Sequence, residues 1–222
     1  MIASSTLRFL KSLSKNNNKP WFDANRPAYE AAKKDVAALT ERIIAALSKK
    51  DPSVAHLTAK DCMFRINRDV RFSKNKSPYK TNMGAFINPG GKKAFTAGYY
   101  LHIEPGGIFA GGGLYMPEPE LLKKVRQEID YNLPAFEAII RHRKFKQVFE
   151  GLDERKEYTL SRVPKGYEAD NPAAPYLKLK SFVATATFED AQATTPGFER
   201  KVLQAFETLQ PLNVFLNEAL QS

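Results

Sequence analysis

Two alternating runs in the middle of the chain, joined by three turn residues, place the strongest constraint on its fold. Residues 98–104 read GYYLHIE and residues 108–114 read IFAGGGL, so apolar side chains recur at alternate positions. The connection between them, Pro105-Gly106-Gly107, is short and contains glycine, as is typical of a β-hairpin. The two runs therefore predict the centre of an antiparallel sheet.

Three more segments have the period of a strand. Residues 63–67 alternate and residues 83–88 are strand-like. Residues 181–188 place Phe and Ala side chains on one face and Val183, Thr185 and Thr187 on the other. We expect all three segments to join the hairpin in one sheet.

Helical spacing predicts helices on both sides of these strands. Leu7, Leu10 and Leu13 define a short first helix, and a longer helix starts at Pro27 and ends before Asp51. The sequence predicts further helices after the hairpin, opened by Pro117 and Pro134, and a last helix from Phe198 that is kinked or broken at Pro211.

The order of helices, strands and helices favours an α+β fold. We predict a single domain over residues 1–222, with a central antiparallel sheet covered on one side by N- and C-terminal helices. The hydrophobic content of 43%, with 15 Phe and 9 Tyr, is sufficient for a core of this size. No repeat, low-complexity tract or domain boundary interrupts the pattern.

The cysteine content and the N-terminal segment indicate the cellular compartment of the protein. The single cysteine, Cys62, cannot form an internal disulfide, so we expect a cytoplasmic protein. The sequence contains no transmembrane segment, so we expect no membrane partner. Arg8 and Lys11 interrupt the first apolar run, which excludes a secretory signal of the usual kind. An organellar transit peptide is the alternative that this basic, serine-rich segment leaves open.

The net charge of +10 is concentrated in one segment. Residues 61–80 contain six basic and two acidic side chains, a surplus of four. Arg68 and Arg71 can hold an anion with two parallel hydrogen bonds, Lys76 and Lys80 add positive charge, and Tyr79 can stack or donate a hydrogen bond. Together these side chains are suited to bind a phosphate group. The alternative is a solvated basic loop in which an acid pairs with one arginine.

Period-two alternation gathers a second set of polar side chains on one sheet face. If Leu101 and Ile103 point into the core, then Tyr100, His102 and Glu104 point away from it. The same reasoning points Phe64 and Ile66 inward, with Arg65 outward, and points Phe109, Gly111 and Gly113 outward. The glycines indicate either a closely approaching ligand or a packing helix or bulge.

Motifs that would identify a specific chemistry are incomplete or absent in this sequence. Two S-x-x-K matches, at Ser73 and Ser77, lack the partner motifs of a serine acyl-enzyme, and no phosphate-binding glycine loop is present. His56, His102 and His142 are too scattered to indicate a metal site, so we expect no metal. The sequence identifies no cofactor and no oligomeric state.

Three long stretches together resemble a known family. They read FLKSLSKNNNKPWFDANRPAYE, FRINRDVRFSKNKSPYKTNMGAFI and GYYLHIEPGGIFAGGGLYMPEPELLKKVRQEI, in this order. They are similar to the domain-of-unknown-function family numbered 2461. The resemblance implies one α+β domain that includes the N-terminal helix, which argues against a cleaved transit peptide. It implies no established activity.

The candidate functions are three. The first is binding of a phosphate-bearing or other anionic small molecule, with or without catalysis; the others are a nucleic-acid-binding module and a protein-interaction domain without chemistry. For catalysis we expect proton transfer by Tyr100 or His102, with Glu104 orienting His102. The residues expected to bind the ligand are Arg65, Arg68, Arg71, Lys76, Tyr79, Lys80, Gly111 and Gly113.

Overall fold

The structure is a computed structural model in which residues 1–221 are described. The chain forms two compact units. Unit 1 contains Met1–Lys92, Tyr100–Ala110 and Thr187–Gln204; unit 2 contains Lys93–Tyr99, Gly111–Ala186 and the segment from Ala205 onward. Several strands and the last helix belong to both units, and the single domain expected from the sequence stays a prediction.

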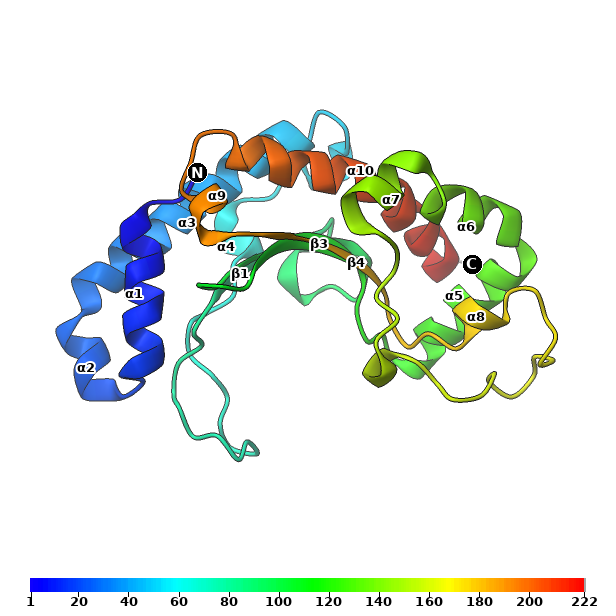
Figure 1. Cartoon of the computed structure of the whole chain (residues 1–222), viewed down its shortest axis with the longest axis horizontal. Coiled ribbons are helices and arrows are strands. Elements are labelled where there is room, and N and C mark those ends of the chain that lie inside the picture. Colours follow the sequence, from blue (N-terminus) through cyan, green and yellow to red (C-terminus); the bar gives the residue numbers. More distant parts are fainter. Residues whose placement is uncertain (222) are drawn as a thin grey trace. The chain divides into compact units, whose positions relative to one another are not determined.

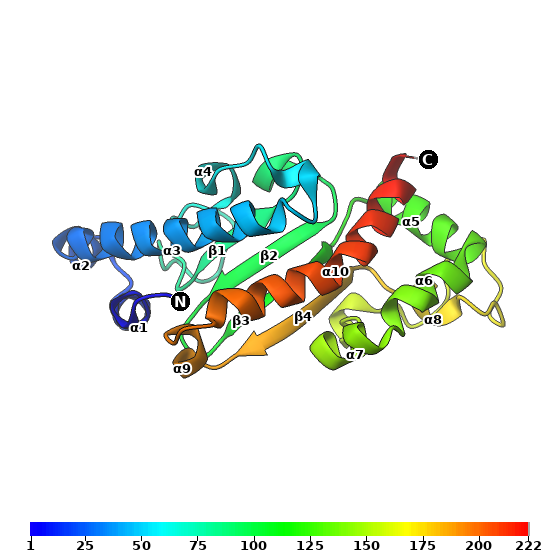
Figure 2. The same cartoon turned by 90° about the horizontal axis from the view of Figure 1, so that it is seen from above.

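The predicted antiparallel sheet is confirmed. It has four strands in the order β1-β2-β3-β4, and β2 and β3 form the hairpin (Figure 2). The strands are β1 (Met83–Ile87), β2 (Gly98–Ile103), β3 (Ile108–Leu114) and β4 (Phe182–Phe188).

Five strands were predicted, and the prediction of a strand at residues 63–67 is wrong. This segment pairs only through two isolated bridges, Met63 with Ala85 and Asn67 with Tyr79. Because it is not a continuous strand, its side chains do not alternate as expected: Ile66 is buried, but Phe64 is 37% exposed.

The two N-terminal helices predicted from the sequence are present in unit 1, and a further short helix, residues 19–24, lies between them in the chain (Figure 1). The side chain of Asn18 caps the second helix by accepting from the backbone N–H of Trp21, and Pro27 lies in the first turn of the third. The helices of unit 1 are α1 (Ser4–Lys15), α2 (Lys19–Ala24), α3 (Arg26–Leu47), α4 (Ala59–Cys62) and α9 (Asp190–Ala193).

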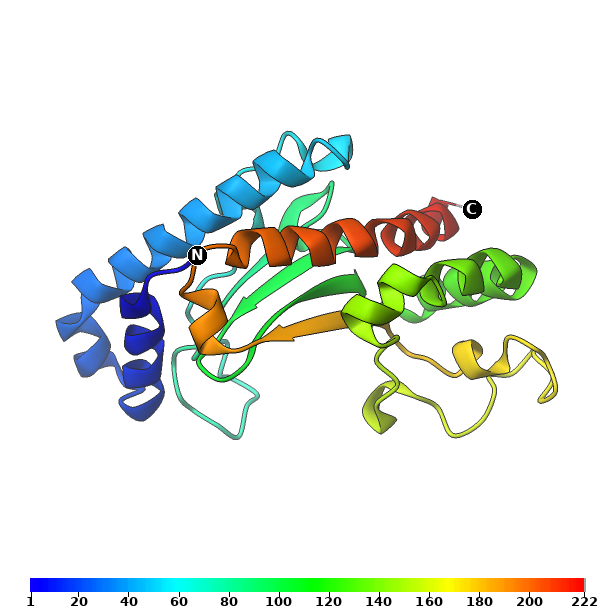
Figure 3. The same ribbon diagram turned by 45° about the horizontal axis from the view of Figure 1, so that its top comes forward.

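One expectation about the later helices needs correction, because the fifth helix begins at Pro119 and not at Pro117. The last helix continues through Pro211, so of the two outcomes expected there a break is excluded and a kink stays a prediction (Figure 3). These helices are α5 (Pro119–Tyr131), α6 (Leu133–Ile140), α7 (Arg143–Phe149) and α8 (Ala174–Leu177) in unit 2, and α10 (Phe198–Gln221), which starts in unit 1 and continues into unit 2. Single 3-10 turns are η1 (Pro52–Val54), η2 (Gly91–Lys93) and η3 (Lys156–Tyr158).

Helices from both ends of the sequence pack on the sheet, as expected. In unit 1, α3 contacts β1 through a buried apolar stripe that includes Val36 and Ile43. In unit 2, the rings of Tyr99 on β2 and Phe206 on α10 lie 5.3 Å apart. Within residues 1–221, no helix is both long enough and apolar enough to cross a membrane.

Candidate functional site

A chain of hydrogen bonds follows the outer face of β2 in unit 1, the face that carries Tyr100 and His102. The phenolic oxygen of Tyr100 lies 3.0 Å from Nδ1 of His102, and Nε2 of His102 lies 3.1 Å from a carboxylate oxygen of Glu104. Thr81 donates its hydroxyl proton to the other Glu104 oxygen at 2.5 Å. The predicted outward direction of these β2 side chains therefore brings them together, because alternate residues share a face.

The direction of donation in this chain follows from Glu104. An ionised carboxylate only accepts hydrogen bonds, so Nε2 of His102 carries the proton that it shares with Glu104. In the neutral imidazole, Nδ1 then accepts from the hydroxyl of Tyr100. Both ring nitrogens of His102 are engaged within the protein, and the Tyr100 hydroxyl is the free end of the chain.

Aromatic rings enclose the chain. The imidazole of His102 stacks on Phe109 with ring centroids 4.7 Å apart, and the Tyr100 ring meets Phe64 edge to face at 6.3 Å. These contacts leave the side chain of His102 only 14% exposed. Phe64 therefore lies on the outer face and contributes to the site, and the expectation that it points into the core is wrong.

Burial and charge shift the ionisation of both ends of the chain. Burial, followed by the nearby charge of Glu104, raises the pKa of Tyr100 to about 12, so its hydroxyl keeps its proton at neutral pH. Burial alone would raise the pKa of Glu104. The hydrogen bonds from Thr81 and His102 outweigh that effect and hold the pKa of Glu104 below its ordinary value.

Two cations border these rings. The ammonium of Lys80 lies 5.2 Å from the centroid of Phe64, and burial, followed by the charge of Arg65, lowers the pKa of Lys80. Arg65 is exposed. Within residues 1–221, neither cation is within ion-pair distance of a carboxylate. Positive charge without an ion-pair partner in the described residues is therefore left beside the ring of Phe64.

Three other predicted ligand residues are engaged inside the basic loop, residues 68–80. Arg68 donates to the carbonyl of Ser77 at 2.9 Å, and Lys76 donates to the carbonyl of Val70 at 3.0 Å. Arg71 forms an ion pair with Asp69 at 2.7 Å, the pairing considered as the alternative for this segment. None of the three has a recorded contact with the Tyr100 chain among the residues that the structure describes.

Tyr79 is a core residue. Its side chain is 7% exposed and its ring stacks on Phe22 of α2 with centroids 3.9 Å apart. The side-chain amide of Asn17 donates to the backbone carbonyl of Tyr79 and accepts from its backbone N–H. Tyr79 therefore joins the basic loop to the N-terminal helices, a contact between residues 62 positions apart that no local pattern predicts.

The glycines of β3 make room for a neighbouring strand. In unit 2, a Cβ atom at Gly111 would lie 2.2 Å from the carbonyl oxygen of Ala184, and one at Gly113 would lie 2.0 Å from that of Phe182. Gly113 also has a φ of 108°, which favours glycine. Close approach of β4 thus accounts for both glycines, and the approaching group is neither the ligand nor the packing helix expected from the sequence.

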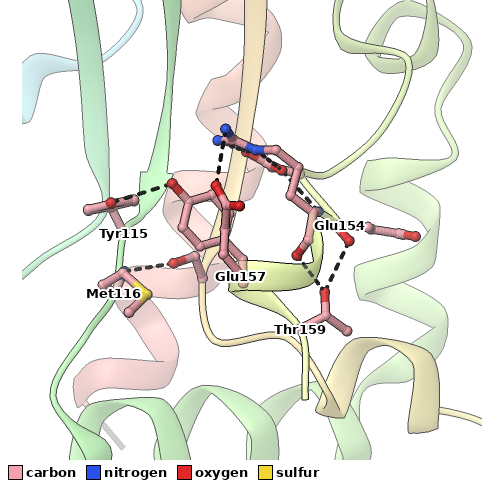
Figure 4. Close-up of polar contacts among 9 residues, drawn as sticks. Tyr115, Met116, Glu154, Glu157 and Thr159 are labelled. Atoms are coloured by element: carbon pink, nitrogen blue, oxygen red, sulfur yellow. Dashed lines mark hydrogen bonds and ion pairs between the residues drawn. The ribbon is translucent and has the colours of Figure 1, made fainter. Parts of the chain in front are cut away.

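A second polar cluster, in unit 2, was not identified from the sequence. The hydroxyls of Tyr115 and Tyr158 lie 3.5 Å apart, and the guanidinium of Arg155 lies 4.7 Å from the centroid of the Tyr158 ring (Figure 4). Arg155 is itself paired with Asp153 at 2.6 Å and with Glu157 at 3.4 Å. Since its cation is neutralised within the cluster, this network braces the loop after α7.

Among the residues that the structure describes, no metal site is found, and the thiol of Cys62 is buried. Within residues 1–221, no three His, Cys, Asp or Glu side chains are grouped so as to hold a metal ion. Burial raises the pKa of Cys62 to about 11, so its thiol stays protonated at neutral pH. His142 accepts a hydrogen bond from the backbone N–H of Lys144 at the start of α7.

Comparison with known proteins gives a family and no activity. A family described as "Conserved hypothetical protein (DUF2461)" matches residues 5–215, nearly the whole chain. This confirms the resemblance seen in the sequence. Neither the curated proteins nor the solved structures contain a match. Function must therefore be inferred from the site.

Proposed function

We propose that this chain, which belongs to the DUF2461 family of conserved hypothetical proteins, binds a phosphate-bearing or other anionic small molecule on the outer face of β2. The observation that carries the proposal is the pair of cations, Lys80 and Arg65: neither has a carboxylate partner among the described residues, and Lys80 lies over the ring of Phe64, which meets Tyr100 edge to face. Most surface cations are solvated and isolated. Here one of them is partly desolvated by an aromatic ring, and a bound anion would compensate that cost.

The proposal assigns a role to each side chain. Lys80 and Arg65 hold the negative group, and the oxygen of Tyr100, whose proton is bonded to His102, can accept a hydrogen bond from a hydroxyl of the ligand. His102 and Glu104 are positioning residues, because their hydrogen bonds fix the side chains behind that hydroxyl. Arg68, Arg71 and Lys76 have bracing roles in the basic loop, so the proposal does not depend on them.

Catalysis is the extension that the hydrogen-bond chain supports. The oxygen of Tyr100 can take a proton from the ligand while its own proton passes to Nδ1 of His102, and the carboxylate of Glu104 stabilises the imidazolium that forms. The raised pKa of Tyr100 means that the phenol is protonated at rest, so it accepts the proton of the ligand only as it passes its own to His102.

Thermal unfolding in the presence of inorganic phosphate, pyrophosphate and a sugar phosphate tests the binding proposal. A ligand that binds only the folded state raises the melting temperature by mass action. Lys80→Ala and Arg65→Ala should each abolish that rise. Lys34→Ala, which removes an exposed cation from α3, is the matched control and should keep it. The proposal fails if no anion stabilises the parent chain, or if all three variants lose the effect equally.

The pH dependence of binding provides a second test. Because the pKa of Lys80 is lowered, its ammonium loses its proton at a lower pH than an ordinary lysine. Affinity for the anion should therefore fall as pH rises through that lowered pKa. In Lys80→Arg, whose guanidinium stays charged, the fall should be absent.

Two broader expectations belong to the same proposal. We place the protein in the cytoplasm because a single cysteine fits a reducing compartment. We also propose that the two units fold together as one domain, which limited proteolysis would test by releasing either one or two stable fragments.

A further inference from the structure

The tip of the basic loop, residues 68–80, presents an aromatic ring to solvent. Phe72 is 96% exposed, more than any other large hydrophobic side chain in the described part of the chain. The loop projects from the β1 end of the sheet, away from α3 (Figure 1). It carries five basic residues and one acid, a net charge of +4. This charge does not explain why the loop carries a phenylalanine at its tip, because the ring packs on no core.

Hydrogen bonds inside the loop hold its tip in one arrangement. The ammonium of Lys76 crosses the loop to the carbonyls of Val70 and Arg71, at 3.0 and 3.3 Å. Arg68 bonds to the carbonyl of Ser77, and the backbone N–H of Ser73 bonds to Val70. A braced tip loses little conformational freedom on binding, which favours a role in recognition.

One face of the Phe72 ring already has a partner. The guanidinium of Arg71 lies 5.8 Å from its centroid, and Asp69 fixes that guanidinium with hydrogen bonds of 3.0 and 2.7 Å. The ion pair with Asp69 therefore favours the position of Arg71 beside the ring. The opposite face of the ring is exposed to solvent, and the exposed cation of Lys74 is two residues away.

The position of Arg71 beside Phe72 bears on which anionic partner the loop can bind, a lipid surface or a nucleic acid. A lipid surface would take up Phe72 only if the paired guanidinium on its face entered the apolar layer as well, which is costly. A nucleic-acid base is flat and can stack on the free face while Arg71 stays in place. The positive charge of the loop suits the adjoining phosphates. The geometry thus favours unpaired bases over a membrane.

We infer that the basic loop binds single-stranded nucleic acid by stacking one base on Phe72, with Lys74 contacting a neighbouring phosphate. This binding site uses none of the side chains assigned to the small anion, so the two proposals stand or fall separately. Base stacking on an aromatic side chain is independent of sequence, so we expect little preference among bases.

Fluorescence polarisation with labelled twelve-nucleotide oligo(dT) and oligo(rU) at low salt tests the inference on the full chain. Phe72→Ala should weaken binding about tenfold, within the range for loss of one stacked base. It should leave the salt dependence unchanged, because no charge is removed. Lys74→Ala should reduce the slope of log affinity against log salt by about 0.7, the value for one phosphate contact on a single strand.

Two further variants separate stacking from a general loss of hydrophobic surface. Phe72→Trp should retain binding, and fluorescence of the introduced indole should be quenched when the oligonucleotide is added. Phe95→Ala removes another exposed phenylalanine, in unit 2, and should bind as the parent does. Each side chain is exposed, so the melting temperatures should stay close to that of the parent.

Three results would overturn the inference. The first is Phe72→Ala binding within twofold of the parent chain. The second is an equal loss of binding in Phe95→Ala. The third is that the parent ignores both oligonucleotides but binds phosphatidylserine-containing vesicles in a manner that depends on Phe72, which would assign the loop tip to a membrane surface instead.

Discussion

The hydroxyl of Tyr100 on β2 lies directly over Gly84 of the neighbouring strand β1, where a Cβ atom would be 2.5 Å from the phenolic oxygen. Two ring atoms of Tyr100 would be 3.0 Å from the same Cβ. The absence of a side chain on β1 therefore allows Tyr100 to reach His102. The hydrogen-bond chain on β2 depends on one residue of the adjacent strand.

Replacing Gly84 should destabilise the protein through this contact. We expect Gly84→Ala to lower the free energy of unfolding by about 1–3 kcal/mol, as overpacking of a filled site does. In a Tyr100→Phe background the loss should be smaller, because the closest atom, the hydroxyl oxygen, is gone. Urea unfolding of the four proteins measures the coupling. Equal losses in the two backgrounds would show that the strain does not involve the hydroxyl.

Alkaline pH should weaken the fold through Tyr100. Its pKa is raised to about 12, whereas an unfolded tyrosine ionises near 10. The contribution of this neutral phenol to stability is complete below pH 10 and is lost as pH rises through 12. Relative to the parent, Tyr100→Phe should therefore gain stability between these values. A constant difference in the free energy of unfolding from pH 9 to pH 12 would contradict the raised pKa.

Lowering the pH should destabilise the fold through protonation of Glu104. Its pKa is held below the ordinary value in the folded protein, so its contribution is present above the unfolded pKa and is lost as pH falls through the folded one. Glu104→Gln should be less stable than the parent at pH 7, and the two should converge in acid. Carboxyl carbon NMR of Glu104 would give the folded pKa directly, and a value above 4.5 would refute the assignment.

Replacement by leucine should have opposite effects on the free energy of unfolding at two asparagines that lie one turn apart on α10. Asn213 is 3% exposed, and neither its amide nitrogen nor its amide oxygen has a partner within residues 1–221. Asn217 instead bonds to both the N–H and the carbonyl of Ala97, at 2.8 and 3.2 Å. Asn213→Leu should raise the free energy of unfolding by about 1 kcal/mol, and Asn217→Leu should lower it by about 1–3 kcal/mol.

Chemical denaturation of the two variants decides this comparison. If Asn213→Leu is markedly destabilised, the buried amide has a hydrogen-bond partner after all, for example an internal water molecule. If Asn217→Leu is unaffected, the backbone of Ala97 has found another partner.

The sequence correctly predicted the features that depend on the spacing of side chains within a single helix or strand. Helices α1 and α3 follow the spacing of their leucines and valines, and alternation in β2 correctly separated Leu101 from His102. Both patterns arise within one element, where side-chain direction is fixed by backbone geometry. The order of elements then gave the α+β class.

Features that depend on distant parts of the chain were not predictable in this way. Phe64 lies in a segment that pairs at isolated positions, so alternation gave it the wrong face. The sequence offered a ligand, a packing helix or a bulge beside Gly111, whereas the space is filled by β4, which follows 71 residues later in sequence. Tyr79 resembled a ligand residue because its neighbours are basic, but its ring is buried by a helix from the N-terminus.

The stacking of Tyr79 on Phe22, with the paired bonds from Asn17, also has a consequence for folding order. The base of the loop cannot close until α1 and α2 are in place, since its anchor is supplied by residues about 60 positions earlier. Native-state hydrogen exchange should therefore find the amides of Tyr79 and of α2 opening together, as one cooperative unit. A chain shortened at its N-terminus would retain the basic sequence and lose the fixed direction in which the loop points.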